Sequence, residues 1–198
     1  MTPPASFYLD VGSPFAYLAA ERLDSVLSPA TAVWRPVSLG ALFKLTGRSS
    51  WALGDPQCRV TGMAAVERRA ALRGLPPLRW PDPWPGNYLM AMRAATYADR
   101  VGRGREFVVQ AMRDAFQQGR DLSLAVHVLE AAERVGLEPG EVERATAHPG
   151  IKQALRDATD SAYEIGVFGV PTVAIGNELF WGDDRLEDAA ANLTGQQQ

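Results

Sequence analysis

The 198-residue chain is poor in the residues that bind metals and form disulfide bridges. It contains one cysteine, Cys58, and two histidines, His127 and His148. A single cysteine forms neither an intrachain disulfide nor a Cys-x-x-Cys redox pair, and these residues are too few for a typical His/Cys metal cluster. We therefore predict no metal site. Because a lone thiol suits a reducing compartment, we expect a cytoplasmic protein.

Long apolar runs and an excess of positive charge are also missing. No window approaches the roughly 18 consecutive apolar residues that a membrane-spanning helix requires. Residues 1–6 are short, uncharged and proline-containing, unlike a signal peptide. The formal net charge of −3 argues against a nucleic-acid-binding surface. We expect neither a membrane nor a nucleic acid as partner.

The N-terminal segment predicts a strand, a helix and a second strand. Residues 7–11 form a short apolar run rich in strand-favouring side chains, ended by a glycine. Ser13 and Pro14 follow as a helix N-cap and a first helical residue. Apolar residues then recur at helical spacing until residues 28–29. Residues 31–37 predict the second strand.

The middle of the chain, residues 39–166, has helical periodicity and almost no strand signal. Three apolar stripes at helical spacing cover residues 107–116, 124–132 and 151–162. Residues 79–86 contain three prolines and therefore predict a loop.

Strand signals return near the C-terminus. Residues 170–175 and 178–181 are apolar runs separated by a Gly-Asn pair, which predicts a β-hairpin. A final helix is expected from about residue 184 to residue 192. The order of elements is therefore β-α-β, a helical segment, then β-β-α.

Two segments carry a family resemblance. The first is Phe-Tyr-Leu-Asp-Val-Gly-Ser-Pro-Phe-Ala-Tyr-Leu at residues 7–18. The second is Gly-Val-Phe-Gly-Val-Pro-Thr at residues 166–172, continued by Glu-Leu-Phe-Trp-Gly-Asp-Asp-Arg-Leu at residues 178–186. Together with Trp-Arg-Pro at 34–36 and Gly-Ala-Leu-Phe-Lys at 40–44, they closely resemble the 2-hydroxychromene-2-carboxylate isomerases. Their relatives are the kappa-class glutathione transferases, within the thioredoxin-fold group related to the disulfide oxidase DsbA.

The resemblance implies an α/β fold with a thioredoxin-like core and an all-helical domain inserted between its halves. The core would comprise residues 1–38 and 167–198, and the inserted domain residues 39–166. In redox members of the group a Cys-x-x-Cys begins the first helix, whereas residues 13–16 here are Ser-Pro-Phe-Ala. Dithiol chemistry at this position is therefore excluded, and the resemblance implies that bound glutathione supplies the sulfur.

Ser13 suits that role chemically. An unperturbed thiol has a pKa of about 8.5. A helix N-terminus favours a nearby anion by about 0.3–2 kcal/mol, and a hydrogen bond to a charged acceptor adds about 1.5–3 kcal/mol. At about 1.36 kcal/mol per pKa unit, the two effects together would lower the pKa of the thiol by about 2 units. The alternative is that Ser13 only caps the helix.

The resemblance implies further glutathione contacts. Val170 precedes Pro171, which is cis in thioredoxin-like proteins, and its backbone would pair with the cysteine part of the tripeptide. Asp184 and Arg185 match the pair that contacts the γ-glutamyl end, whose ammonium and carboxylate suit an adjacent acid and base. Arg48 stands where family members often have asparagine, and it is a candidate ligand for the glycine carboxylate.

Other residues are candidates for the substrate pocket. Lys44, Asn87 and Trp84 occupy plausible pocket positions, and aromatic walls suit an aromatic substrate. Arg59 is the alternative to Arg48 for the glycine carboxylate. We interpret Cys58 as an incidental thiol, because no Cys-His pairing is evident.

The leading hypothesis is a glutathione-dependent isomerase acting on a 2-hydroxychromene-2-carboxylate-like compound of aromatic catabolism. The thiolate would add to a conjugated carbon, rotation would follow, and elimination would release the isomer. The nearest alternative is a kappa-class-like transferase, which consumes glutathione. An alternative of another class is a non-catalytic, peptide-binding thioredoxin module. The implied partners are glutathione and a small aromatic substrate, and the resemblance adds the expectation of a homodimer.

Overall fold

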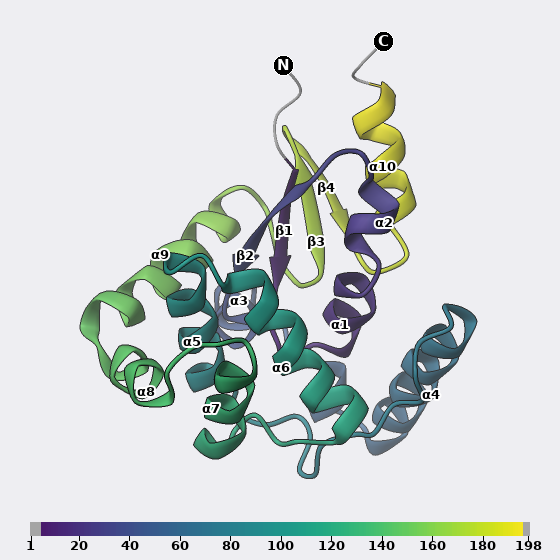
Figure 1. Cartoon of the computed structure of the whole chain (residues 1–198). Helices are drawn as coiled ribbons and strands as arrows, with labels where there is room; N and C mark the ends of the chain where they lie inside the picture. The colour runs from purple at the N-terminus through teal and green to yellow at the C-terminus, as the bar shows by residue number, and fades with distance from the viewer. Residues whose placement is uncertain (1–4, 196–198) are drawn as a thin grey trace.

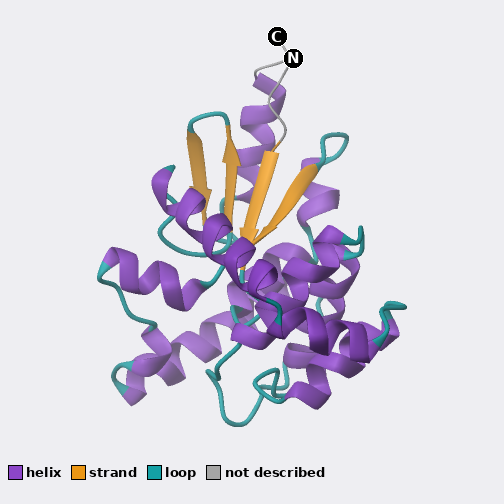
Figure 2. Ribbon diagram, turned by 90° about the vertical axis from the view of Figure 1, so that its left-hand side faces the viewer, coloured by secondary structure: helices purple, strands orange, loops and turns teal. Residues whose placement is uncertain are grey.

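A computed structural model describes residues 5–195. Its sheet has four strands in the order β2-β1-β3-β4: β1 Ala5–Leu9, β2 Ala32–Pro36, β3 Thr172–Ile175 and β4 Glu178–Trp181. β1 pairs in parallel with β2 and antiparallel with β3, and β3 and β4 form an antiparallel hairpin. Figure 2 shows the four strands as one layer beside a larger helical part. Strands from the N-terminal part and the C-terminal part of the chain therefore form one sheet.

Helices cover both sides of this sheet. α1 (Pro14–Ala20) and α2 (Leu23–Leu27) follow β1, and α10 (Leu186–Gly195) closes the chain. α10 packs against α2, β3 and β4, whereas α9 (Pro149–Glu164) packs against β2. Figure 1 shows α10 and α2 on one side of the strands and α9 on the other. All residues of β3 are buried, because β3 lies inside the sheet with both faces covered.

The helical part surrounds one central helix. Its remaining elements are α3 Leu39–Thr46, the short 3-10 helix η1 Trp51–Leu53, α4 Pro56–Leu72, α5 Leu89–Arg100, α6 Gly104–Gln118, α7 Ala125–Arg134 and α8 Pro139–Ala147. α5 packs against α6, α7, α8 and α9. The buried residues of α5 are Met92 and four alanines. The small alanine side chains allow other helices to approach α5 on several sides.

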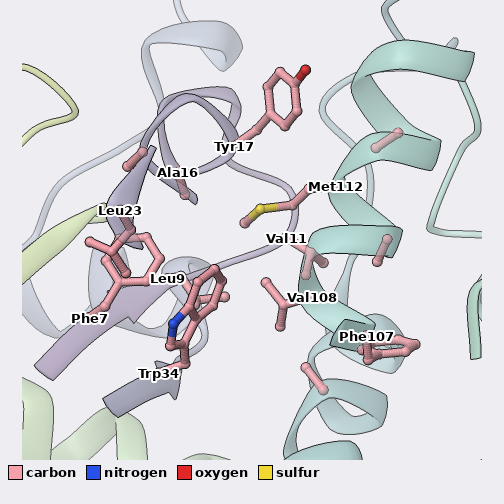
Figure 3. Packing of buried hydrophobic residues seen from close by; sticks show 14 of the residues in the cluster. Phe7, Leu9, Val11, Ala16, Tyr17, Leu23, Trp34, Phe107, Val108 and Met112 are labelled. Atoms are coloured by element: carbon pink, nitrogen blue, oxygen red, sulfur yellow. The ribbon is translucent and has the colours of Figure 1, made fainter. Parts of the chain in front are cut away.

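The apolar core runs continuously from the sheet into the helices. One cluster of buried side chains includes Phe7 of β1, Tyr17 of α1 and Phe107 and Met112 of α6, and Figure 3 shows residues of the sheet and of α6 facing one another. Because this core spans both parts, the predicted division of the chain into two domains, residues 1–38 with 167–198 and residues 39–166, stays a prediction. Within residues 5–195, no helix combines the length and apolarity needed to cross a lipid bilayer.

Most predicted elements are confirmed. The first strand, predicted at residues 7–11, lies at Ala5–Leu9, and two of the predicted helices need correction. The predicted stripes correspond to α6, α7 and α9, and the proline-rich segment is a loop. The helix expected to run to residues 28–29 is wrong as a single element, because it is interrupted at Glu21 and Arg22 between α1 and α2. The last helix begins at Leu186 rather than at about residue 184, so Asp184 and Arg185 lie in the turn that precedes it.

Candidate functional site

A cavity of about 1100 Å³ lies where the sheet meets the helical part. Its walls come from the start of α1, from α3, α5 and α9, and from the segment that leads into β3. The sequence-predicted residues that line it are Ser13, Val170, Arg48, Lys44, Asn87 and Trp84. Residues far apart in the chain thus face one space.

Ser13 is both a helix cap and a cavity residue. Its Oγ accepts a hydrogen bond from the backbone N–H of Ala16 at 3.2 Å, and Pro14 occupies the first helical position. The side chain is 5% exposed, and its hydroxyl donates no hydrogen bond to any residue between 5 and 195. Capping uses the oxygen as an acceptor, so the hydroxyl proton remains available to an acceptor in the cavity.

The loop that presents Ser13 is fixed by Asp10. One carboxylate oxygen of Asp10 accepts from the N–H of Gly12 and the other from the N–H of Leu39, each at 2.9 Å. The N–H of Ser13 donates to the carbonyl of Asp10 at 3.0 Å. Burial raises the pKa of Asp10 to about 6, despite these hydrogen bonds. Sequence reasoning missed Asp10, although an acid at the end of an apolar strand, three residues before a helix cap, was a visible signal.

Residues at the start of α5 contact the same loop, residues 10–13, that Asp10 holds. The backbone N–H of Val11 donates to the Sδ atom of Met92 at 3.3 Å. Tyr88, just before α5, lines the cavity, and its hydroxyl accepts from the N–H of Gly86 at 2.9 Å. Burial raises the pKa of Tyr88 to about 12, so its hydroxyl stays protonated and can donate. The sequence analysis did not identify Tyr88.

Val170 faces the cavity beside a cis peptide bond. The Val170–Pro171 peptide is cis, as the resemblance implied, and Val170 lines the cavity whereas Pro171 does not. The backbone N–H and C=O of Val170 make no hydrogen bond with another residue of the 5–195 range. An unpaired backbone segment beside a cavity can pair with an extended peptide.

Asp184 and Arg185 lie outside the cavity lining. Asp184 is paired instead with Arg69 of α4 at 3.2 Å, and Arg185 faces Asp188. The Arg69 guanidinium also lies 5.5 Å from the ring centre of Phe15, which does line the cavity. Asp184 therefore lies near the start of α1 without reaching the lining.

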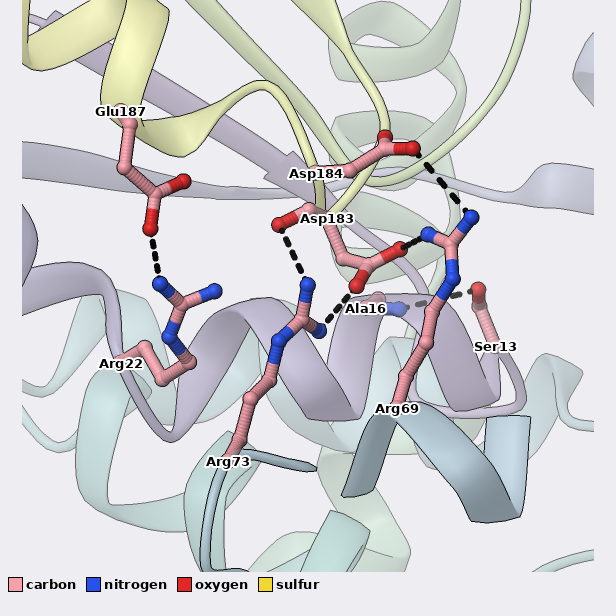
Figure 4. A network of polar contacts seen from close by, with 8 residues as sticks. All are labelled: Ser13, Ala16, Arg22, Arg69, Arg73, Asp183, Asp184 and Glu187. Carbon is pink, nitrogen blue, oxygen red and sulfur yellow. Dashed lines mark hydrogen bonds and ion pairs between the residues drawn. The ribbon is translucent and has the colours of Figure 1, made fainter. Parts of the chain in front are cut away.

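Asp183, the residue before Asp184, is buried, whereas Asp184 is exposed. Asp183 is 1% exposed, and its carboxylate is held by the guanidinium groups of Arg69 and Arg73 (Figure 4). These contacts join α4 to the turn before α10. Sequence reasoning missed Asp183, Arg69 and Arg73.

Aromatic and basic side chains form much of the remaining wall. Trp84 is 4% exposed and packs between Trp51, at 5.3 Å, and Trp80, at 4.6 Å between ring centres. The Arg48 guanidinium lies 4.1 Å from the ring centre of Phe168. Arg59, the alternative to Arg48, does not line the cavity and donates to the carbonyl of Trp84.

Cys58 and the acids of the site do not form a metal centre. Cys58 lines the cavity and is exposed. Among residues 5–195, no group of three or more His, Cys, Asp or Glu side chains is arranged to hold a metal ion.

The sheet order β2-β1-β3-β4 and the cis proline directly before β3 are those of a thioredoxin-like protein. The family model of the DSBA-like thioredoxin domain matches residues 6–194. The chain therefore belongs to the DsbA-like thioredoxin family, which confirms the predicted fold.

Individual relatives narrow the comparison. The chain is 28% identical over 189 residues to a protein named 2-hydroxychromene-2-carboxylate isomerase from Sphingobium xenophagum, covering 94% of this chain and 96% of that one. It is 25% identical over 198 residues to a protein of the same name from Pseudomonas putida, covering 96% and 95%. The predicted resemblance is thereby confirmed.

Solved structures agree with these relatives. A 2-hydroxychromene-2-carboxylate isomerase structure matches with a TM-score of 0.86 at 25% identity, covering 98% of this chain and 97% of that one. A probable DsbA oxidoreductase from Streptomyces coelicolor matches with a TM-score of 0.77 at 20% identity, covering 99% and 92%. The latter supports the fold alone.

Proposed function

We propose that this protein is a glutathione-dependent isomerase acting on 2-hydroxychromene-2-carboxylate-like compounds. One observation carries the proposal. The Ser13 hydroxyl, which donates no hydrogen bond to a described residue, borders the same cavity as the unpaired backbone of Val170. A hydroxyl donor and a backbone edge are what a thiol-containing peptide requires. The relatives named 2-hydroxychromene-2-carboxylate isomerase support the substrate class.

The cavity fits two ligands together. Its volume of about 1100 Å³ is slightly larger than the roughly 300–1,000 Å³ of small-molecule sites, so a tripeptide and a bicyclic aromatic compound have room side by side. Arg48, which borders the cavity, carries a cation that suits the glycine carboxylate. The aromatic wall around Trp84 suits a flat substrate.

In the proposed mechanism, glutathione held by Ser13 and the Val170 backbone would supply a thiolate for reversible nucleophilic addition to a conjugated carbon of the substrate. The Ser13 hydroxyl would donate a hydrogen bond to the sulfur and so favour the thiolate over the thiol. Ser13 cannot itself form a disulfide, so the sulfur is not captured. Val170 orients the tripeptide through its backbone, and the Tyr88 hydroxyl, neutral because its pKa is raised, is a donor for a substrate oxygen.

Calorimetry with glutathione tests the binding part of the proposal. We propose that the γ-glutamyl end reaches beyond the cavity lining to Asp184 and Arg185, as the family resemblance implies, so the Asp184→Ala/Arg185→Ala double variant should bind at least about tenfold more weakly than wild type. The matched control is Glu143→Ala/Arg144→Ala, which removes an adjacent exposed acid and base from α8, outside the cavity. Equal affinities of the two double variants would remove Asp184 and Arg185 from the site. Absence of binding to wild type would overturn the proposal.

Product analysis separates the alternatives. After turnover of 2-hydroxychromene-2-carboxylate, an isomerase returns glutathione unchanged, whereas a transferase depletes it in proportion to product. Binding of unfolded peptides without any response to glutathione would instead indicate a peptide-binding module.

A further inference from the structure

The cavity is lined by more cations than acids, although the chain as a whole is acidic, with a formal net charge of −3. The cations are Lys44, Arg48, Arg93, Lys152 and Arg156, and the acids are Asp10, Asp55 and Asp160. None of these five cations forms an ion pair with a residue in the 5–195 range. The chain has only two lysines, and both are in this group. Such a concentration of unpaired positive charge favours an anionic ligand.

Arg93 differs from the other four cations in having a buried nitrogen atom without a hydrogen-bond partner in the described part of the chain. It lies on α5, next to Met92, whose sulfur accepts from Val11 in the loop that presents Ser13. Its Nε is buried and has no hydrogen-bond partner, and its guanidinium forms no ion pair with another described residue. A buried donor without a partner costs free energy. Since Arg93 lines the cavity and no described residue forms an ion pair with it, its guanidinium is available to an anionic ligand there.

The facing wall adds two cations. Lys152 and Arg156 are one helical turn apart on α9, and both line the cavity. Like charges at this spacing destabilise a helix, so helix stability does not explain the pair. α5 packs against α9, and Arg100 at the end of α5 donates to the carbonyl of Gly150 near the start of α9 at 3.2 Å. This contact places the two walls side by side.

We propose that Arg93, with Lys152 and Arg156, binds the carboxylate of the substrate. The inference rests on the proposed function and names the residues that would bind the carboxylate of its substrate. A guanidinium presents paired donors that match the two oxygens of a carboxylate. Arg48 belongs to a different wall, because it lies over Phe168, two residues before Val170. The cavity thus offers separate cations for the tripeptide and for the substrate.

The test compares two unreactive bicyclic probes, chromone-2-carboxylate and the uncharged chromone-2-carboxamide, by calorimetry on glutathione-saturated protein. Wild type is expected to bind the acid at least about tenfold more tightly than the amide. Arg93→Gln is expected to abolish this preference for the acid. Arg93→Lys keeps the charge but loses the paired guanidinium donors, and it is expected to retain part of the preference. Arg68→Gln is the matched control, because it removes one charge from an exposed position on α4 outside the cavity.

The outcomes distinguish this inference from the function on which it rests. If Arg93→Gln keeps the wild-type preference, or if wild type binds acid and amide equally while binding glutathione, the carboxylate site is wrong and the isomerase proposal stands. If glutathione does not bind, the isomerase proposal fails, and the acid-to-amide ratio of the free protein still tests Arg93. Should Arg93→Gln not fold, Lys152→Gln/Arg156→Gln replaces it, with an expected loss of at least about threefold in preference; an unchanged ratio overturns the inference.

Discussion

The ring of Tyr88 occupies the space that a side chain at Gly12 would need. A Cβ atom built on Gly12 would lie 2.0 Å from the Cδ2 atom of Tyr88. Gly12 has no positive φ angle, so the position requires glycine for space rather than for backbone conformation. This contact packs the start of α5 directly on the loop before Ser13, and it fixes two walls of the cavity relative to each other.

Gly12→Ala is therefore expected to displace Tyr88 and to lower the free energy of unfolding by about 1–3 kcal/mol, as overpacking does. Removing the ring relieves the clash, so the Gly12→Ala/Tyr88→Ala double variant should lose less stability than the sum of the two single variants. Urea unfolding of the four proteins measures this coupling. Strictly additive losses would contradict the close packing.

The buried Asp183 carboxylate predicts an unequal effect of two arginine substitutions. Arg73→Gln leaves a 1% exposed acid with Arg69 as its remaining cation, and should cost about 1–3 kcal/mol. Arg22→Gln breaks a pair with Glu187, whose side chain is 58% exposed, and should cost less than about 1 kcal/mol. Chemical denaturation compares the two, and equal costs would argue against a structural role for Asp183.

The raised pKa of Asp10 predicts a pH-dependent stability. Burial raises this pKa from 3.8 to about 6, so between these values the folded state holds a proton that the unfolded state has released. The contribution of Asp10 to the free energy of unfolding therefore falls as pH rises from 4 to 7, by an amount on the order of 3 kcal/mol.

Asp10→Asn does not titrate and lacks this decline. The stability of wild type relative to Asp10→Asn should therefore decrease by up to about 3 kcal/mol between pH 4 and pH 7. Denaturant unfolding at both pH values measures it. A difference that does not change with pH would mean that the Asp10 carboxyl titrates normally.

The sequence was sufficient where the signal is local. Ser13 and Pro14 form a cap signature that requires only adjacent residues, and the structure has Ser13 as the N-cap of α1. The cis Val170–Pro171 peptide, in contrast, was implied by the family resemblance and not by a local signal. The break between α1 and α2 was not predictable in this way, because neither glycine nor proline marks residues 21–22.

Contacts between distant helices could not be predicted. Asp183 and Asp184 are adjacent acids that the sequence does not distinguish. The packing of α4, which carries Arg69 and has Arg73 as its C-cap, makes Asp183 buried and leaves Asp184 exposed. Arg93 becomes a cavity residue only because α5 packs beside α9. Such placements depend on tertiary packing that periodicity does not encode.

The central claim is that Ser13 stabilises the thiolate of bound glutathione, and the pKa of that thiol tests it most directly. In a Cys58→Ala background the protein has no thiol of its own, so the ultraviolet absorbance of the thiolate reports the bound tripeptide alone. We predict a pKa about 2 units below the usual value of about 8.5, and a rise of at least about 1 unit in Ser13→Ala. A bound thiol that titrates like free glutathione, or a cavity that binds no tripeptide at millimolar concentration, would contradict the account.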